Sequence, residues 1–412
     1  MARQSTLIFQ HGTNSENVKE LFLQYLKKKT IFKNKHVLTD AFFPNEILHR
    51  DKELMQLSST LAPALKGYKP NNIFIYGGVG TGKTICTKLV LKQLQEVVDN
   101  NKLPVKTIYI NCKLKKVADT EYRLLAQLLN EFGITVPDTG LPTDVLYRKF
   151  FSVVEKSRKI VIIALDEIDA LVGKIGDDFL YNFTRINTEL ASGNISLIGI
   201  TNKLNLYNEL DARVKSSLSE EEIFFHPYNA LQLRDILWQR AEKAFHPGVV
   251  EEGVINKCAA LAAQEHGDAR RALDLLRTAG EIAERYNSDK VLEEHVDLAH
   301  QKLEMDRTLE AIRMLPKQSQ LVLAAILKLG KKYSPLHTVE VFREYKSMCN
   351  KNGIKPLTIR RVNDLLNELS ALGIIDSRVV SRGRYGRQRE ITLAIEGDIL
   401  DATEKLLFAF IS

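Results

Sequence analysis

The sequence predicts an α/β domain built on a mostly parallel sheet, followed by an all-α domain and a C-terminal winged helix-turn-helix. Up to Phe225, apolar runs of strand length alternate with helical patterns, as they do in parallel sheets connected by helices. Between Asn229 and about Met305 only helical patterns occur. From about Thr308 onward, three helical patterns precede two short strands, which is the order of elements in a winged helix.

A phosphate-binding motif follows the first predicted strand. The apolar run from Ile73 to Tyr76 leads directly into Gly77-x-x-x-x-Gly82-Lys83-Thr84, the P-loop pattern. Glycines let successive N–H groups point at one anion, and the helix that follows places its positive end beneath that anion. Lys83 then reaches the β- and γ-phosphates, and the Thr84 hydroxyl ligates magnesium. The sequence thus predicts a P-loop NTPase that binds ATP or ADP with Mg²⁺ through Gly78, Val79, Gly80, Thr81, Gly82, Lys83 and Thr84.

The composition is that of a globular protein without membrane segments. The 412 residues suffice for two to four domains, each with its own core. No apolar run approaches the length of a membrane span, and the N-terminus lacks the apolar centre of a signal peptide. The cysteines show no metal-ligand spacing, which favours reduced thiols. We therefore expect a soluble cytoplasmic protein.

The positive charge is concentrated near the C-terminus. Between Pro316 and Arg389 there are 15 Lys and Arg residues against five Asp and Glu, whereas the net charge of the whole chain is +7. The rest of the chain is therefore net acidic. A basic block of this kind predicts contact with a polyanion such as DNA, and a solvated basic face is the alternative.

The chain divides into four predicted segments. Residues 1–37 form an N-terminal extension, in which Ser15 to Lys29 has the periodicity of an amphipathic helix. Because the apolar face of this helix is short, an arm packed on the body is favoured over a membrane-surface helix. The nucleotide-binding domain is expected over residues 38–226, the all-α domain over 227–306 and the winged helix over 307–412.

The elements of the α/β domain follow from the same patterns. An extended segment from Leu38 is followed by a helix through Leu65. Beyond the P-loop, strands are expected at Val105 to Asn111, Ile160 to Leu165, Ile195 to Ile200 and Glu222 to Phe225. Helices are expected at Thr120 to Phe132, at Thr143 to Lys156 and around residues 210–218.

Polar residues follow two of these strands. Asp166 and Glu167 come directly after the third strand of the domain, and Asn202 follows the fourth. Ligands of open α/β sheets bind at the carboxyl ends of the strands, where the P-loop also lies. Asp166 is suited to hold magnesium and Glu167 to polarise an attacking water, while Asn202 can hydrogen-bond the γ-phosphate. A helix cap for Glu167 and a turn residue for Asn202 are the alternatives.

Two arginines begin a helix of the all-α domain. From Gly267 the chain reads G-D-A-R-R-A-L-D-L-L-R, which puts Arg270 and Arg271 in the first helical turn. Positive charge is unfavourable at that end of a helix. An anionic partner would account for it, and an ordinary surface pair is the alternative.

The last domain carries the predicted DNA-contacting residues. Its helices are expected at Gln318 to Leu329, Thr338 to Lys351 and Thr358 to Leu372, and its strands at Ile374 to Val380 and Glu390 to Ala394. The N-terminal end of the third helix meets base edges in such motifs, and here it carries Thr358, Arg360, Arg361 and Asn363. The turn between the strands suits the minor groove and its phosphates, through Arg382, Arg384, Tyr385, Arg387 and Arg389. A wing that binds protein is the alternative.

In combination and order, these motifs resemble those of AAA+ ATPases, and specifically of archaeal replication initiators related to the eukaryotic origin recognition complex and its cell-division-cycle helicase-loading partner. The resemblance extends from about Leu38 to the C-terminus. Besides the P-loop and the winged helix, it is carried by F-P-N-E-I-L-H-R-D-K-E-L, L-D-E-I-D, G-I-T-N-K-L, L-D-A-R-V-K-S-S-L and G-D-A-R-R-A-L-D-L-L-R.

The resemblance implies further residue roles. The segment Glu46 to Arg50, with His49 and Arg50, would lie along the adenine and ribose, Asn202 would be the first sensor, and Arg270 would be the second, acting from a helical lid. Arg213 matches the arginine finger, which acts on the nucleotide of a neighbouring subunit. The family's extra DNA-contacting helix falls on the segment that holds Lys113, Lys115 and Lys116, for which a solvated turn is an equal alternative.

The sequence therefore predicts an ATP-regulated initiator that binds duplex DNA at replication origins and hydrolyses ATP slowly, as a switch. The resemblance adds the replicative helicase and paralogous initiator subunits as expected partners. One alternative is a transcription regulator in which the same winged helix binds promoters. Another is an ATPase whose winged helix binds protein alone.

Overall fold

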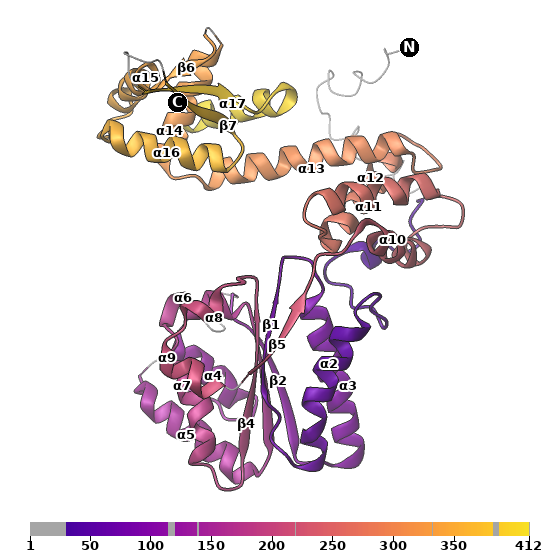
Figure 1. Ribbon diagram of the computed structural model, residues 1–412. Coiled ribbons are helices and arrows are strands. Elements are labelled where there is room, and N and C mark those ends of the chain that lie inside the picture. The colour runs from indigo at the N-terminus through magenta and orange to yellow at the C-terminus, as the bar shows by residue number, and fades with distance from the viewer. Residues whose placement is uncertain are drawn as a thin grey trace, which may run out of the picture. The chain divides into compact units, whose positions relative to one another are not determined.

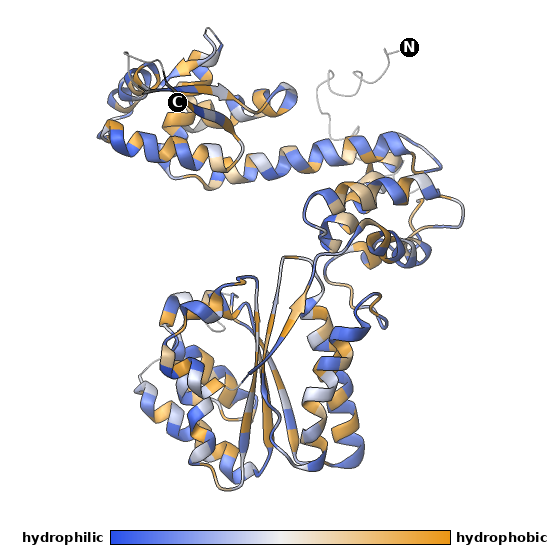
Figure 2. Cartoon of the chain, in the orientation of Figure 1, coloured by the Kyte–Doolittle hydropathy of each residue, from blue (hydrophilic) through white to orange (hydrophobic). Residues whose placement is uncertain are grey.

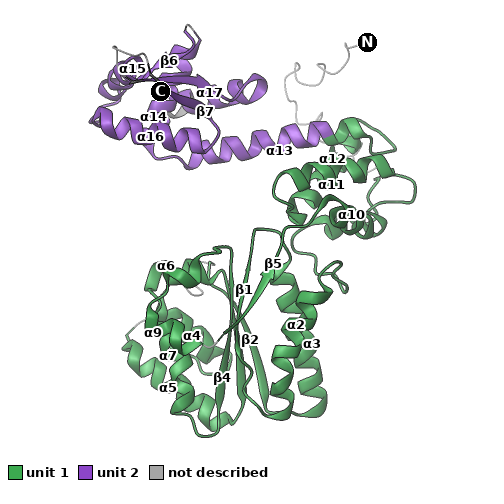
Figure 3. Cartoon of the chain, viewed as in Figure 1, with its two compact units in different colours: residues 1–296 green, residues 297–412 purple. Residues whose placement is uncertain are grey.

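The computed structural model describes residues 30–113, 120–137, 140–218, 220–331, 333–381 and 387–411. The chain divides into two compact units, residues 1–296 and 297–412 (Figure 3). The first unit holds the α/β and all-α domains and the second holds the winged helix. The boundary between them falls within a single helix, α13 (Glu293–Met314).

A five-stranded parallel sheet forms the centre of the first unit. In the order β2-β3-β4-β1-β5, its strands are Val105–Asn111, Ile160–Asp166, Asn194–Thr201, Asn72–Gly77 and Glu220–Phe225. Within β1, Ile73 and Ile75 join the core on one face, whereas Phe74 and Tyr76 join the core on the other, because side chains alternate along a strand. The predicted parallel sheet is confirmed, and each strand lies within two residues of its expected bounds.

Helices cover both faces of this sheet, and the apolar residues of the strands lie between the two helical layers (Figures 1 and 2). One face packs against α2 (Asp51–Leu61) and α3 (Lys83–Asn101), with the 3₁₀ helix η2 (Ala62–Lys66) after α2. The other packs against α4 (Glu121–Asn130), α5 (Thr143–Ser157), α6 (Ile168–Ile175), α7 (Asp178–Arg185), α8 (Leu206–Glu209) and α9 (Ala212–Leu218), with η3 (Ile186–Thr188) after α7.

The sequence did not predict α6, α7 or α8. These helices have eight, eight and four residues, which is too short for a helical period to stand out. None of the described helices is long and apolar enough to cross a membrane.

The all-α domain consists of α10 (Ala230–Ala244), α11 (Glu252–Gln264), α12 (Ala269–Arg285) and the beginning of α13, as predicted. We call it the lid.

The first described residues pack on the lid. The Phe32 ring stacks on Phe245 with 4.6 Å between centroids, and the Lys33 N–H donates to the Ala244 carbonyl at 2.8 Å. A Cβ on Gly280 of α12 would lie 2.5 Å from the Phe32 ring, so this position requires glycine. The chain then continues through η1 (Lys35–Leu38) against α10 and α12. The sequence analysis assigned residues up to 37 to an N-terminal extension. In the structure residues 30–38 pack against the lid. The helix expected over Ser15 to Lys29 lies outside the described residues.

The second unit has the predicted winged-helix architecture. Its helices α14 (Lys317–Gly330), α15 (Thr338–Lys351) and α16 (Ile359–Ala371) enclose one apolar core together with an antiparallel sheet of order β6-β8-β7, whose strands are Leu336–His337, Arg387–Leu393 and Ile375–Ser381. The sequence analysis missed β6 and a C-terminal helix, α17 (Gly397–Ile411), which packs against α14.

Candidate nucleotide-binding site

A cavity of about 400 Å³ opens at the carboxyl ends of the strands of the first unit. One wall is the P-loop, from Val79 to Thr84, and another comes from the lid. Gly80 and Gly82 have φ of +68° and +97°, a left-handed backbone that favours glycine. A Cβ on Gly80 would also lie 1.5 Å from a carboxylate oxygen of Asp268. The curvature of the P-loop therefore favours glycine at both positions, and the close approach of the lid also requires it at Gly80.

Lys83 is buried at the centre of this cavity wall. Its Nζ donates to the carbonyls of Gly77 and Gly78 at 2.8 and 2.6 Å and to Oδ1 of Asn202 at 2.9 Å. Burial lowers the pKa of Lys83 to about 8. The structure thus brings together the predicted phosphate-binding lysine of α3 and the predicted sensor, Asn202, which follows β4.

Asp166 ends β3 beside the P-loop. Its Oδ2 accepts hydrogen bonds from Thr84 Oγ1 at 2.8 Å and from Tyr109 Oη at 2.5 Å. Desolvation and the hydrogen bond to Asp166 raise the pKa of Tyr109. A hard divalent cation such as Mg²⁺ prefers oxygen ligands of this kind, so the two predicted metal ligands, Thr84 and Asp166, fit that ion. The sequence analysis did not single out Tyr109, which fixes the orientation of the carboxylate.

Glu167 follows Asp166 with a φ of +54° at the start of α6 and lines the cavity. Its Oε2 lies 3.2 Å from Nζ of Lys113, which lines the same cavity. Lys113 was expected to contact DNA phosphates, whereas its partner in this structure is the predicted catalytic carboxylate. Lys115 and Lys116 lie outside the described residues.

The lid contributes Arg270 to the cavity wall. Asp268 caps α12 by accepting from the N–H groups of Arg270 and Arg271 at 2.8 and 3.4 Å, which offsets the positive charge at this helix end. The N–H of Ala269 donates to the Gly80 carbonyl at 3.2 Å. The lid helix is therefore hydrogen-bonded directly to the P-loop.

The residues expected along adenine and ribose divide into two groups. Glu46, Ile47 and Leu48 line the cavity. His49 and Arg50 are not among the residues that line the cavity, and their expected contact with the nucleotide stays a prediction. His49 Nε2 lies 2.9 Å from Oδ2 of Asp235 on α10.

Arg50 is buried and holds several chain segments together. It donates through Nε to the Thr81 carbonyl at 2.9 Å and through Nη2 to the His226 carbonyl at 2.6 Å. Its guanidinium also pairs with Glu53 at 2.8 Å and lies 3.9 Å from the centroid of the Tyr228 ring. With these partners Arg50 supports the P-loop from behind.

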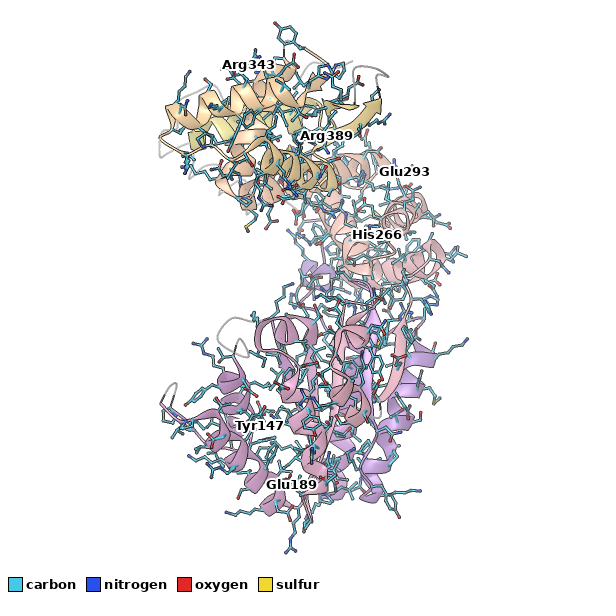
Figure 4. All side chains as sticks on the ribbon, turned by 60° about the vertical axis from the view of Figure 1, so that its left-hand side comes forward. Tyr147, Glu189, His266, Glu293, Arg343 and Arg389 are labelled. Atoms are coloured by element: carbon cyan, nitrogen blue, oxygen red, sulfur yellow. The ribbon has the colours of Figure 1, made fainter. Side chains whose placement is uncertain are left out.

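The candidate DNA-contacting residues of the second unit lie on α16 and β8. The Thr358 hydroxyl caps α16, and Arg360 and Arg361 are exposed in its first turn. Nη1 of Arg389 on β8 donates to the Asn363 carbonyl at 3.2 Å, which ties the wing strand to α16. Figure 4 shows Arg389 in the same unit as Arg343 of α15. Arg382, Arg384, Tyr385 and the side chain of Arg387 lie outside the described part of the chain.

Comparisons with known families and proteins agree with this architecture. An AAA domain matches residues 67–207, a Cdc6 AAA+ ATPase-type lid domain matches residues 234–301, and a CDC6 C-terminal winged helix domain matches residues 310–403. An ORC1-type DNA replication protein of Pyrococcus abyssi is 52% identical over 381 residues, which cover 91% of this chain and 90% of that protein. The chain belongs to the ORC1-type DNA replication proteins.

Other members of the ORC1-type family show how far the likeness extends. ORC1-type DNA replication protein 1 of Methanosarcina acetivorans is 48% identical over 396 residues, which cover 95% of this chain and 94% of that protein. A solved structure of the Aeropyrum pernix ORC1 protein, in complex with DNA, matches with a TM-score of 0.79 and 44% identity over 93% of this chain and all of that chain. The resemblance inferred from the motifs is thereby confirmed.

In this ORC1-type protein Arg213 lies away from the nucleotide cavity. It is exposed on α9, with Nε 3.1 Å from Oδ1 of Asp211 and Nη2 3.9 Å from Oδ1 of Asp178. Together with Tyr181 and Arg185 of α7 it lines a separate shallow groove. Arg213 is thus placed on an outer surface of its unit, where its expected role requires a second subunit.

The sequence analysis missed several residues of the cavity wall. In this ORC1-type protein they are Thr39 to Pro44 and, from the lid, Ile236, Gln239, Arg240 and Leu273. No local motif marks these positions, because they meet only when residues distant in sequence pack together. The one sequence feature that could have marked some of them is the extended segment with two phenylalanines before Pro44.

Proposed function

We propose that this ORC1-type protein binds ATP with Mg²⁺ in the P-loop cavity and uses slow hydrolysis to control its binding to duplex DNA at replication origins. The observation that carries the proposal is the cavity itself, to which the sheet contributes Lys83, Asp166 and Glu167 and the lid contributes Arg270. A nucleotide bound there contacts both domains at once. Its hydrolysis changes what Arg270 can contact, so the position of the lid depends on the nucleotide state.

Each residue of the cavity has a role in this proposal. Lys83 exchanges its carbonyl partners for the β- and γ-phosphates, while Thr84 and Asp166 hold Mg²⁺, which neutralises developing phosphate charge when bound. Glu167 orients the attacking water. Lys113 must leave the Glu167 carboxylate or share it with that water, so its ion pair at 3.2 Å opposes hydrolysis until the pair opens.

The second unit supplies the DNA contacts of the proposal. The N-terminal end of α16 reads base edges, and the basic wing contacts phosphates. Lys113, Lys115 and Lys116 are available as further phosphate contacts, and Arg213 acts on the nucleotide of a paralogous subunit. The protein then helps to recruit the replicative helicase and acts in the cytoplasm, associated with the nucleoid. Support comes from the family of the chain and from the A. pernix relative solved with DNA.

Duplex DNA binding by the purified protein tests this function. Affinity is measured over a salt series with ATP, with ADP and without nucleotide, on origin, promoter and random fragments. Tight binding confined to origin fragments is expected. Preference for promoters would favour a transcription regulator with the same domains.

A third reading, in which the winged helix binds only protein, makes a different prediction. In that case Arg384→Ala with Arg387→Ala leaves both the duplex affinity and its salt dependence unchanged. Under the proposal, each lost phosphate contact reduces the salt slope by about one.

Replacing Arg360 and Arg361 together by Ala is expected to reduce the preference for origin over random DNA by about tenfold to 100-fold for each base contact removed. The reason is that both side chains are exposed in the first turn of α16. Competition binding with the two fragments measures the ratio, and Arg343→Ala on α15 is the matched control. An equal loss of affinity on both fragments would make these arginines phosphate contacts only.

A further inference from the structure

The cavity wall contains a cation, Arg240, that has no ion-pair partner among the described residues. Arg240 lies on α10 and lines the cavity, and only 7% of its surface is exposed. Its Nε and Nη1 atoms are buried and have no hydrogen-bond partner among the described residues. Burial lowers its pKa to about 10, so the side chain remains charged at neutral pH.

One face of this guanidinium is covered by an aromatic ring. Its central carbon lies 4.6 Å from the centroid of Phe42, a cation-π contact. Phe42 belongs to the segment of residues 39–48 that also lines the cavity, and its N–H donates to the Thr39 carbonyl at 3.1 Å. The ring fixes the plane of the guanidinium but supplies no acceptor for its N–H groups.

Burying such a group without an acceptor is costly. A buried donor without a partner loses its hydration and gains nothing in return, and the loss is greater for a charged group. Two other cations of the cavity wall have partners, since Lys83 donates to two carbonyls and an amide and Lys113 pairs with Glu167. Arg240 is a donor without any acceptor function, so the partner that its N–H groups lack is an acceptor atom.

The position of Arg240 indicates which part of a nucleotide supplies that atom. The phosphates of a P-loop ligand lie at Lys83 and the first turn of α3. Arg240 instead contacts Phe42, and the same cavity is lined by the aromatic and apolar side chains of Phe43, Ile236 and Leu273, which suit the flat faces of a base. The hydrogen-bond acceptors of adenine are its ring nitrogens.

We propose that Arg240, oriented by Phe42, donates a hydrogen bond to a ring nitrogen of the purine base and so helps to determine which nucleotides the site accepts. This inference rests on the proposed nucleotide-binding function and adds to it a base-reading residue supplied by the lid. The lid then contacts the nucleotide at two places, at the base through Arg240 of α10 and at the γ-phosphate through Arg270. Both contacts join the lid to the sheet domain.

The test compares ATP with 1-deaza-, 3-deaza- and 7-deaza-ATP, in each of which one ring nitrogen is replaced by C–H. For the unmodified protein, one of the three analogues is expected to bind about tenfold or more weaker than ATP, the loss typical of a hydrogen bond to a charged group. In Arg240→Met, which keeps an unbranched apolar side chain but removes the guanidinium, ATP itself is expected to bind as weakly as that analogue, and the difference between them disappears. Arg234→Met, on the same helix but partly exposed and paired with Asp235, is the control that retains the difference.

Several outcomes would overturn the inference. In one, all three analogues bind the unmodified protein as tightly as ATP. In another, Arg240→Met weakens inorganic tripolyphosphate as much as ATP, which would make Arg240 a phosphate contact. If the unmodified protein binds no ATP at all, the proposed function fails, and the base contact fails with it.

Discussion

Replacing Glu167 by Gln is expected to leave ATP binding intact and to slow hydrolysis by about 100-fold or more, the contribution of a positioned general base. Glu167 lines the cavity beside Asp166 but is not hydrogen-bonded to Thr84 or Lys83 in the structure. The amide keeps the size of the side chain and loses only the charge that polarises water. Equilibrium ATP binding and single-turnover hydrolysis, measured on the same preparation, separate the two effects.

A matched control for Glu167→Gln is Glu96→Gln. Glu96 lies on the exposed side of α3, 4.0 Å from Nζ of Lys92, and its replacement should change neither measurement. Normal turnover by Glu167→Gln would refute the catalytic assignment. A loss of ATP binding would instead mean that the Glu167 carboxylate supports the site structurally, with its charge balanced by Lys113.

Lys83→Ala is expected to weaken ATP binding by about 100-fold, because charge-assisted hydrogen bonds to two phosphates are lost. The lysine is 6% exposed and is already held at the mouth of the P-loop by two carbonyls and by Asn202. The Lys83 side chain therefore loses little conformational freedom when the nucleotide binds. Calorimetric titration with ATP measures the loss, and Lys92→Ala on the exposed face of the same helix is the control. Unchanged affinity in Lys83→Ala would contradict a P-loop mode of binding.

The same lysine gives ATP binding a pH dependence. The pKa of Lys83 is lowered by burial from 10.5 to about 8, and the phosphates of a bound nucleotide raise it again. At a pH between these two pKa values, Lys83 is deprotonated in the nucleotide-free protein and protonated in the nucleotide-bound protein. Binding at about pH 9 is therefore accompanied by proton uptake, and affinity falls as pH rises through the lower pKa. Titrations in buffers of different ionisation enthalpy detect this proton, and Lys83→Ala should lack it.

The parts of the site that could be predicted from the sequence are those specified by a few consecutive residues. The P-loop, Asp166, Glu167 and Asn202 each sit at the end of a strand whose apolar run is visible on its own. Because parallel strands end at one edge of the sheet, local patterns were enough to bring these residues together. The winged helix was predicted for the same reason, since its three main helices have clear periodicity.

What the sequence analysis missed depends on packing between distant segments. Arg240 has no neighbour in the sequence that marks it as a cavity residue, and it acquires its position only when residues 39–48 fold against α10. The motif that suggests a nucleotide contact for Arg50 does not show that its guanidinium bonds to Thr81, Glu53 and His226. Lys113 belongs to the segment in which the resemblance implies a DNA contact, and nothing in that segment marked its position beside Glu167.

The attachment of residues 30–38 to the lid has a mechanical consequence. The chain passes between the lid and the sheet domain twice, once through residues 39–50 and once through residues 226–229. A body held by one tether can turn about any axis, whereas a body held by two can swing only about the line that joins them. Arg50 bonds the end of one crossing to His226 at the start of the other and to the Thr81 carbonyl, so the pivot of that swing lies against the loop that holds the phosphates.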